Sequence, residues 1–206
     1  MGTLSKFWNA NARPAGWTGR LALHIMNLTH TPTALWNLSL IDFKPHQTIL
    51  DVGCGGGKNI ARMLRRCPES QVYGIDYSEE SVAMSRRKNS RQLGNRCFIQ
   101  QGNVLELPYN ASKFDLVTAY ETVYFWPDLQ KAFSEIFRVL KPGGLFTFSY
   151  GLPDSPAMRY WANKIDTMTI LPAESIKRLL TGTGFTNLKT ATKGSHTINF
   201  RAYKPR

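Results

Sequence analysis

The fold is decided by residues 49–59, which read Ile-Leu-Asp-Val-Gly-Cys-Gly-Gly-Gly-Lys-Asn. Residues 48–50 are β-branched or aliphatic, as in a buried strand, and that run stops at Asp51. Glycine then recurs at positions 53, 55, 56 and 57, and this residue permits both a positive φ and the close approach of a ligand to the backbone. Residues 58–65 repeat apolar side chains at helical spacing. The stretch predicts a strand, a tight turn and a helix, with a ligand site at the carboxyl end of the strand.

The spacing of the glycines restricts the ligand. A dinucleotide fingerprint G-x-G-x-x-G needs a third glycine, which lets the helix pack closely on the strand. The two possible frames place Lys58 or Ile60 at that position, so a nicotinamide dehydrogenase is disfavoured. The next expected strand, residues 71–75, ends at Asp76, where an acidic side chain can bond both hydroxyls of a ribose. The pattern favours a nucleoside ligand of another kind.

The series Asp51-x-Gly53-x-Gly55-x-Gly57 resembles motif I of the class I S-adenosylmethionine-dependent methyltransferases. Residues 139–144, Val-Leu-Lys-Pro-Gly-Gly, resemble the late motif of the small-molecule branch, as in ubiquinone/menaquinone-type methyltransferases. The resemblance implies an enzyme that transfers a methyl group from S-adenosylmethionine to a small acceptor and releases S-adenosylhomocysteine. Such an in-line displacement depends on alignment and exclusion of water, and it uses neither a metal nor a covalent intermediate.

The resemblance also implies a cofactor site. Asp51 would help to hold the ammonium group, and Asp76 would fix the ribose. Asn103 stands where the family often has aspartate, and its amide oxygen can accept a hydrogen bond from the adenine amino group. Arg20 would clamp the methionine carboxylate. The residues expected at the cofactor are Arg20, Asp51, Gly53, Cys54, Gly55, Asp76, Tyr77, Ser78, Asn103, Val104 and Tyr120.

The expected acceptor loop is residues 120–126, which follow a fourth strand. A general base is needed only if the acceptor loses a proton on methylation, so no catalytic residue is assigned. Glu121, Tyr120 and Tyr124 are the candidates, and His24 and His30 are two weaker ones. The chain contains no H-E-x-x-H or C-x-x-C motif, so no metal site is expected.

The chain of 206 residues is long enough for one domain with a three-layer core. Residues 1–46 are expected to form an N-terminal helical lid, with helices over 17–28 and 31–41. Residues 47–206 are expected to form an α/β, Rossmann-like, doubly wound sheet of seven strands, with helices on both faces and the last strand antiparallel. An irregular insert over 151–172 would cap the acceptor site.

Net charge and cysteine content bear on partners and location. The formal net charge is +12, which leaves an RNA methyltransferase as the alternative function. The basic residues are spread along the chain, however, which is more typical of a solvated surface. A non-catalytic cofactor-binding module is a further alternative. Three cysteines without a C-x-x-C pair, and no apolar run of membrane length, predict free thiols in a cytoplasmic protein that is not inserted in a membrane. The acceptor, the methylated atom and the oligomeric state are not assigned.

Overall fold

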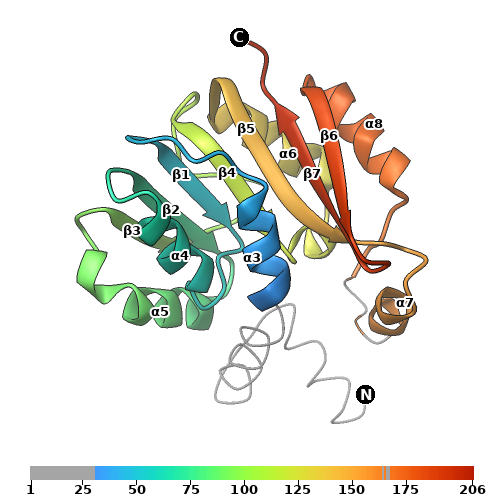
Figure 1. Cartoon of the computed structure of the whole chain (residues 1–206), viewed down its shortest axis with the longest axis horizontal. Helices are drawn as coiled ribbons and strands as arrows, with labels where there is room; N and C mark the ends of the chain where they lie inside the picture. Colours follow the sequence, from blue (N-terminus) through green and yellow to red (C-terminus); the bar gives the residue numbers. More distant parts are fainter. Residues whose placement is uncertain (1–30, 164, 166–167) are drawn as a thin grey trace. The chain divides into compact units, whose positions relative to one another are not determined.

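The computed structural model describes residues 31–163, 165 and 168–206 (Figure 1). The expected lid helix over 17–28 lies outside these residues, as do Arg20, His24 and His30, and the division at residue 46 stays a prediction. The chain falls into two compact units, Met1–Asn103 and Val104–Arg206, which are called the first and the second unit below. Among the described residues, no helix is both long and apolar enough to span a bilayer.

The first unit alternates helices with parallel strands. Its described elements are α3 (Thr31–Ser39), β1 (Thr48–Val52), α4 (Lys58–Arg66), β2 (Gln71–Asp76), α5 (Glu79–Lys88), the 3₁₀ turn η1 (Ser90–Gln92) and β3 (Cys97–Gln101). Strand β2 pairs in parallel with both β1 and β3. Helix α4 packs on β2, and α5 packs on β2 and β3. The parallel βαβ arrangement around the glycine turn is therefore present.

The core of the first unit is aliphatic. Ile49, Leu50, Ile60 and Val72 are fully buried, in agreement with β-branched and aliphatic strands covered by helices. Gly74 on β2 explains how α4 lies so close to the sheet, because a Cβ added there would stand 2.4 Å from the Cδ1 atom of Ile60. The close helix–strand contact that a dinucleotide fingerprint obtains from its third glycine is provided here by a glycine in the neighbouring strand.

The second unit has parallel and antiparallel strands. Its described elements are β4 (Phe114–Tyr120), the 3₁₀ turn η2 (Val123–Phe125), α6 (Leu129–Val139), β5 (Leu140–Gly151), α7 (Pro156–Ala162), α8 (Ala173–Thr183), β6 (Thr186–Lys193) and β7 (Thr197–Tyr203). Strand β5 pairs in parallel with β4 and antiparallel with β7, and β6 pairs antiparallel with β7 (Figure 1). The order of the seven-stranded sheet is β3-β2-β1-β4-β5-β7-β6. The expected Rossmann-like fold with an antiparallel last strand is confirmed.

The core of the second unit is aromatic. The rings of Phe146 and Phe148 stack with centroids 4.8 Å apart, and Phe148 stacks on Phe200 at 5.0 Å. Phe133 on α6 covers the first two of these rings, at 5.9 and 5.8 Å. Aromatic pairs of this kind add a specific attraction to the large apolar area that they bury. The hydrophobic face of α6 is thereby fixed on strand β5.

The sequence predicts a helix that starts at Pro127, a fifth strand over residues 145–150 and an irregular insert over 151–172, and the structure corrects all three. Helix α6 begins at Leu129, because the side chain of Asp128 caps it by accepting the Lys131 N–H at 2.9 Å. Strand β5 begins at Leu140 instead of residue 145, with a register shift in its pairing with β4. The insert over 151–172 contains helix α7, where the Sδ of Met158 packs against Gly151 and would lie 2.2 Å from a Cβ at that position.

Candidate functional site

The turn after β1 takes its shape from alternating glycines. Gly53, Gly55 and Gly57 have φ values of 70°, 51° and 74°, in the left-handed region that a side chain disfavours. The N–H groups of Gly53 and Cys54 both donate to the Ile75 carbonyl, at 2.8 and 3.1 Å, so the turn is attached to the end of β2. The D-x-G-x-G-x-G spacing therefore marks the residues at which this backbone path needs positive φ.

Gly57 and Gly55 differ in what surrounds them. A Cβ on Gly57 would lie 2.3 Å from the Ser85 Oγ and 2.6 Å from the Asn89 Nδ2, and Asn89 donates to the Gly57 carbonyl at 3.1 Å. Gly57 thus allows α5 to pack against the start of α4. A Cβ on Gly55 would have no atom within 4 Å, so the turn is open at that residue. A ligand has room to approach the backbone at Gly55.

The carboxylate of Asp76 is held by backbone N–H groups. Its Oδ2 accepts the Gly55 N–H at 2.8 Å, and its Oδ1 accepts the Ser78 N–H at 2.9 Å. Burial raises the pKa of Asp76, and the hydrogen bonds from Ser78 and Gly55 partly offset that effect. The Ser81 side chain also hydrogen-bonds to this carboxylate, whose remaining lone pairs can accept further hydrogen bonds. The arrangement can therefore bind a pair of adjacent hydroxyls beside the open glycine turn.

The other expected cofactor residues of the first unit have different environments. Asp51 is buried in β1, and Tyr77 is 54% exposed beside Asp76. Ser78 is buried and caps α5, where its side chain accepts the Ser81 N–H. Asn103 is exposed at the end of the unit. Burial, followed by the charges of Asp76 and Asp51, raises the pKa of the Cys54 thiol far above its usual value, so this cysteine stays protonated.

In the second unit, Glu121 adopts an unusual backbone conformation at the end of β4. Its φ is 58°, which is rare for a residue other than glycine and is typical of sites under functional constraint. The Ser149 hydroxyl donates to Oε1 at 2.8 Å, and the Tyr124 hydroxyl donates to Oε2 at 3.2 Å. The Glu121 N–H in turn donates to Ser149 Oγ at 3.2 Å. Two hydroxyls thus fix the direction of this carboxylate.

These contacts give the three candidates for proton transfer different properties. Burial and the nearby charge of Glu121 raise the pKa of Tyr124 far above its usual value, so Tyr124 acts as a neutral hydrogen-bond donor. Tyr120 is buried, and it pairs with Ser149 across β4 and β5.

Val104, the remaining expected cofactor residue of this unit, is also buried. Ser149 was missed from the sequence, because only the strand register brings it to Glu121.

Part of the insert is fixed next to Tyr124. The Tyr150 hydroxyl accepts the Leu171 N–H at 2.6 Å and donates to the Thr169 carbonyl at 3.1 Å. The Thr169 N–H donates to the Tyr124 carbonyl at 2.8 Å. Residues 169–171 are therefore bound to both β5 and η2. Among the described residues, no group of three or more His, Cys, Asp or Glu is arranged to hold a metal ion.

Comparison with known proteins shows what part of the chain is similar to. Residues 50–148 match a family model described as a methyltransferase domain. The chain is 38% identical over 110 residues to 24-methylenesterol C-methyltransferase 3 of Arabidopsis thaliana, a match of 53% of this chain and 30% of that protein. It is 32% identical over 148 residues to an O-methyltransferase of Pyrenophora dematioidea, covering 68% and 55% of the two chains. It is 31% identical over 134 residues to a demethylmenaquinone methyltransferase of Lactiplantibacillus plantarum, covering 64% and 56%.

Solved structures share the fold at lower identity. One is from the Haloferax volcanii complex that contains the Trm112 methyltransferase activator, with a TM-score of 0.80, 20% identity and 98% of each chain covered. Another is Haemonchus contortus phosphoethanolamine N-methyltransferase 2 bound to phosphomonomethylethanolamine and S-adenosylhomocysteine, with a TM-score of 0.80, 16% identity, and 100% and 61% covered. The chain spans about a third to about half of the lengths of the sequence relatives named above, so they inform its domain more than its whole activity.

Proposed function

We propose that this chain, whose residues 50–148 match a methyltransferase-domain model, is a class I S-adenosylmethionine-dependent methyltransferase that methylates a small-molecule acceptor. The observation that carries the proposal is the carboxylate of Asp76, which is fixed by the N–H groups of Gly55 and Ser78. A ribose diol on this carboxylate would place a nucleoside against the open side of the glycine turn, where Gly55 leaves room. Tyr77, exposed beside it, would then contact the nucleoside.

The other cofactor residues follow from this placement. Asp51 would act on the ammonium group of the methionine part, and Asn103 and Val104 would border the adenine. Tyr120 would line the acceptor side of the site, and Arg20 would bind the methionine carboxylate. With the donor aligned, the sulfonium needs only a well-placed nucleophile and little water.

Glu121 would take the proton of an acceptor that becomes acidic on methylation. Support comes from the left-handed backbone of Glu121 and from the two hydroxyls that orient its side chain. A general base must be held in a fixed direction toward the proton that it removes. The late motif at residues 139–144 and the demethylmenaquinone methyltransferase relative make a quinol-like ring hydroxyl or ring carbon the first acceptor class to examine. Tyr124 and Ser149 would keep the carboxylate aimed at that proton.

The basic surface gives weaker support to RNA as the acceptor. Several cations are occupied by main-chain carbonyls of the fold. Arg86 donates to Ile99, Arg96 donates to three carbonyls that include Cys67, and Lys204 donates to Phe137 and Leu140. These side chains help to hold helices and strands together, so fewer charges are left for phosphates than the net charge of +12 implies.

The test is methyl transfer from radiolabelled S-adenosylmethionine to a panel of a demethylated naphthoquinol, a catechol, a sterol, a primary amine and a short RNA. We expect transfer to a small molecule and none to RNA. Glu121→Gln should lower kcat roughly 100-fold or more for acceptors that lose a proton, while Glu174→Gln on an exposed face should have no effect. Transfer to RNA alone, or an unchanged rate in Glu121→Gln, would contradict the respective part of the proposal.

A further inference from the structure

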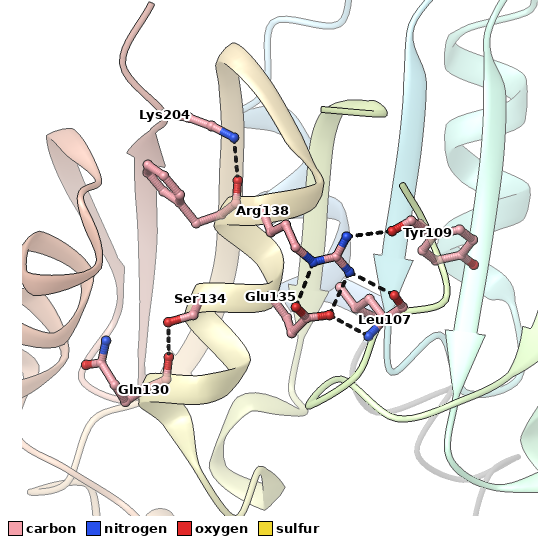
Figure 2. A network of polar contacts seen from close by, with 8 residues as sticks. Leu107, Tyr109, Gln130, Ser134, Glu135, Arg138 and Lys204 are labelled. Carbon is pink, nitrogen blue, oxygen red and sulfur yellow. Dashed lines mark hydrogen bonds and ion pairs between the residues drawn. The ribbon is translucent and has the colours of Figure 1, made fainter. Parts of the chain in front are cut away.

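Helix α6 carries an ion pair that hydrogen-bonds to the main chain shortly after the start of the second unit. Glu135 and Arg138 bond to each other and to the main chain of residues 107–109 (Figure 2). Arg138 donates to the Tyr109 carbonyl at 2.7 Å and to the Leu107 carbonyl at 2.9 Å. It also donates to both oxygens of Glu135, at 2.7 Å each. The Oε2 of Glu135 accepts the Leu107 N–H at 2.7 Å. We call this arrangement the Glu135–Arg138 clamp.

The clamp fixes both polar backbone groups of one residue. The Leu107 N–H binds a carboxylate and its carbonyl binds a guanidinium, while its side chain is buried. Hydrogen bonding from Arg138 lowers the pKa of Glu135, so the pair stays ionised over the physiological range. A guanidinium that donates two charge-assisted hydrogen bonds to one carboxylate fixes the orientation of the partner as well as its distance. The path of the chain at Leu107 is therefore set by α6.

The clamped residue follows closely on the turn expected at the adenine. Asn103 and Val104 lie four and three residues before Leu107. The stretch from Asn103 to Leu107 is too short for its first residues to move independently of Leu107. On the preceding side, the Gly102 N–H donates to the Asp76 carbonyl at 3.0 Å, and the Gln101 side chain donates to the Tyr77 carbonyl at 3.0 Å. The chain is thus held immediately before Asn103 and again at Leu107.

We propose that the Glu135–Arg138 clamp is a positioning pair that sets the conformation of residues 103–106 and thereby the preference of the site for adenine. This inference rests on the proposed function, because it needs a nucleoside cofactor beside Asn103. The two residues would act on the ligand only through the turn that they hold. Loss of the clamp would leave the Asp76 contacts in place but let the adenine-facing amide move out of line.

The experiment compares two ligands by titration calorimetry: S-adenosylhomocysteine and S-inosylhomocysteine, in which an oxo group replaces the 6-amino group. The variants are Arg138→Ala, Arg138→Lys and Glu135→Gln. Arg138→Lys keeps the charge but loses the two-pronged geometry, and it serves if Arg138→Ala does not fold. The control is Asp115→Asn, which breaks the Lys141–Asp115 ion pair of the same unit, at 2.8 Å, without touching residues 103–109.

We expect the wild type to prefer the adenine ligand by roughly ten-fold or more, because an Asn103 amide held with its oxygen toward the 6-position accepts a hydrogen bond from the amino group of adenine but meets a second acceptor in the oxo group of the inosine ligand. The clamp variants should reduce that preference to about three-fold or less, whereas Asp115→Asn should preserve it. A folded clamp variant with the wild-type preference would overturn the inference, as would a wild type that binds both ligands equally. Failure of the wild type to bind either ligand would instead overturn the proposed function.

Discussion

The first unit holds its polar site mainly with backbone groups, whereas the second unit holds its polar site mainly with side chains. In the first unit, left-handed glycines shape the turn, and the N–H groups of Gly55 and Ser78 fix Asp76. In the second unit, hydroxyls from Ser149 and Tyr124 fix Glu121. A backbone site depends on φ values that only certain residues allow, so it tolerates few changes. A side-chain site depends on individual hydrogen bonds, each of which contributes about 1 kcal/mol to stability.

The cores of the two units also differ, in the kind of side chain that fills them. The described strands of the first unit are packed with aliphatic side chains such as Leu50 and Val72, whereas stacked phenylalanines fill the second. A parallel strand buried on both faces favours small branched residues. Strands β5 and β7 instead share a layer of stacked rings, whose β5 members contact α6, and each ring buries more area than an aliphatic side chain. Removing one ring should therefore cost more than trimming an aliphatic residue.

The largest expected effect is on this aromatic layer. Phe148→Ala should lower the free energy of unfolding by about 4 kcal/mol, because it leaves a cavity among Phe146, Phe200 and Phe133. Ile49→Val in the first unit should cost about 1 kcal/mol. Chemical denaturation of both variants measures the difference. A cost for Phe148→Ala as small as that of Ile49→Val would remove the contrast between the cores.

The next effect concerns the glycine turn. Gly57→Ala should destabilise the protein by about 2–4 kcal/mol and reduce cofactor binding, since it combines a positive φ with a clash against Ser85 and Asn89. Gly182→Ala is the matched control, because its Cβ enters open space near the end of α8. That control should be neutral or stabilising by up to about 1 kcal/mol. A tolerated Gly57→Ala would show that the turn does not depend on backbone geometry.

A smaller effect is expected from Tyr124, through pH. Because the pKa of Tyr124 is raised in the folded protein, the unfolded chain loses this proton first as pH rises above about 10. The stability that Tyr124 supplies is therefore present below that pH and is lost at higher pH. Tyr124→Phe should lower the free energy of unfolding by about 1 kcal/mol at pH 7. In the alkaline range the unfolding free energy of this variant should fall less steeply with pH than that of the wild type. Parallel slopes of unfolding free energy against pH would contradict the assigned burial.

The same difference between the units explains how much the sequence predicts. The glycine turn and the place of Asp76 at the end of a strand were both predicted, because each is encoded by residues close together in the chain. Ser149 was not predicted as a partner of Glu121, since the two residues are 28 positions apart and meet only through strand register. The clamp was missed for a similar reason, because Arg138 binds carbonyls 29 and 31 positions away. Helix α7 was missed because prolines suggested an irregular insert.

Titration calorimetry of S-adenosylhomocysteine and of NAD against the wild type, Asp76→Ala and Glu79→Ala tests the central claim most directly. The account predicts roughly micromolar binding of S-adenosylhomocysteine and no binding of NAD. It further predicts that Asp76→Ala weakens binding roughly ten-fold or more, while Glu79→Ala on the exposed start of α5 does not. Binding of NAD instead, or an affinity for S-adenosylhomocysteine that Asp76→Ala leaves unchanged, would contradict the placement of the nucleoside on this carboxylate.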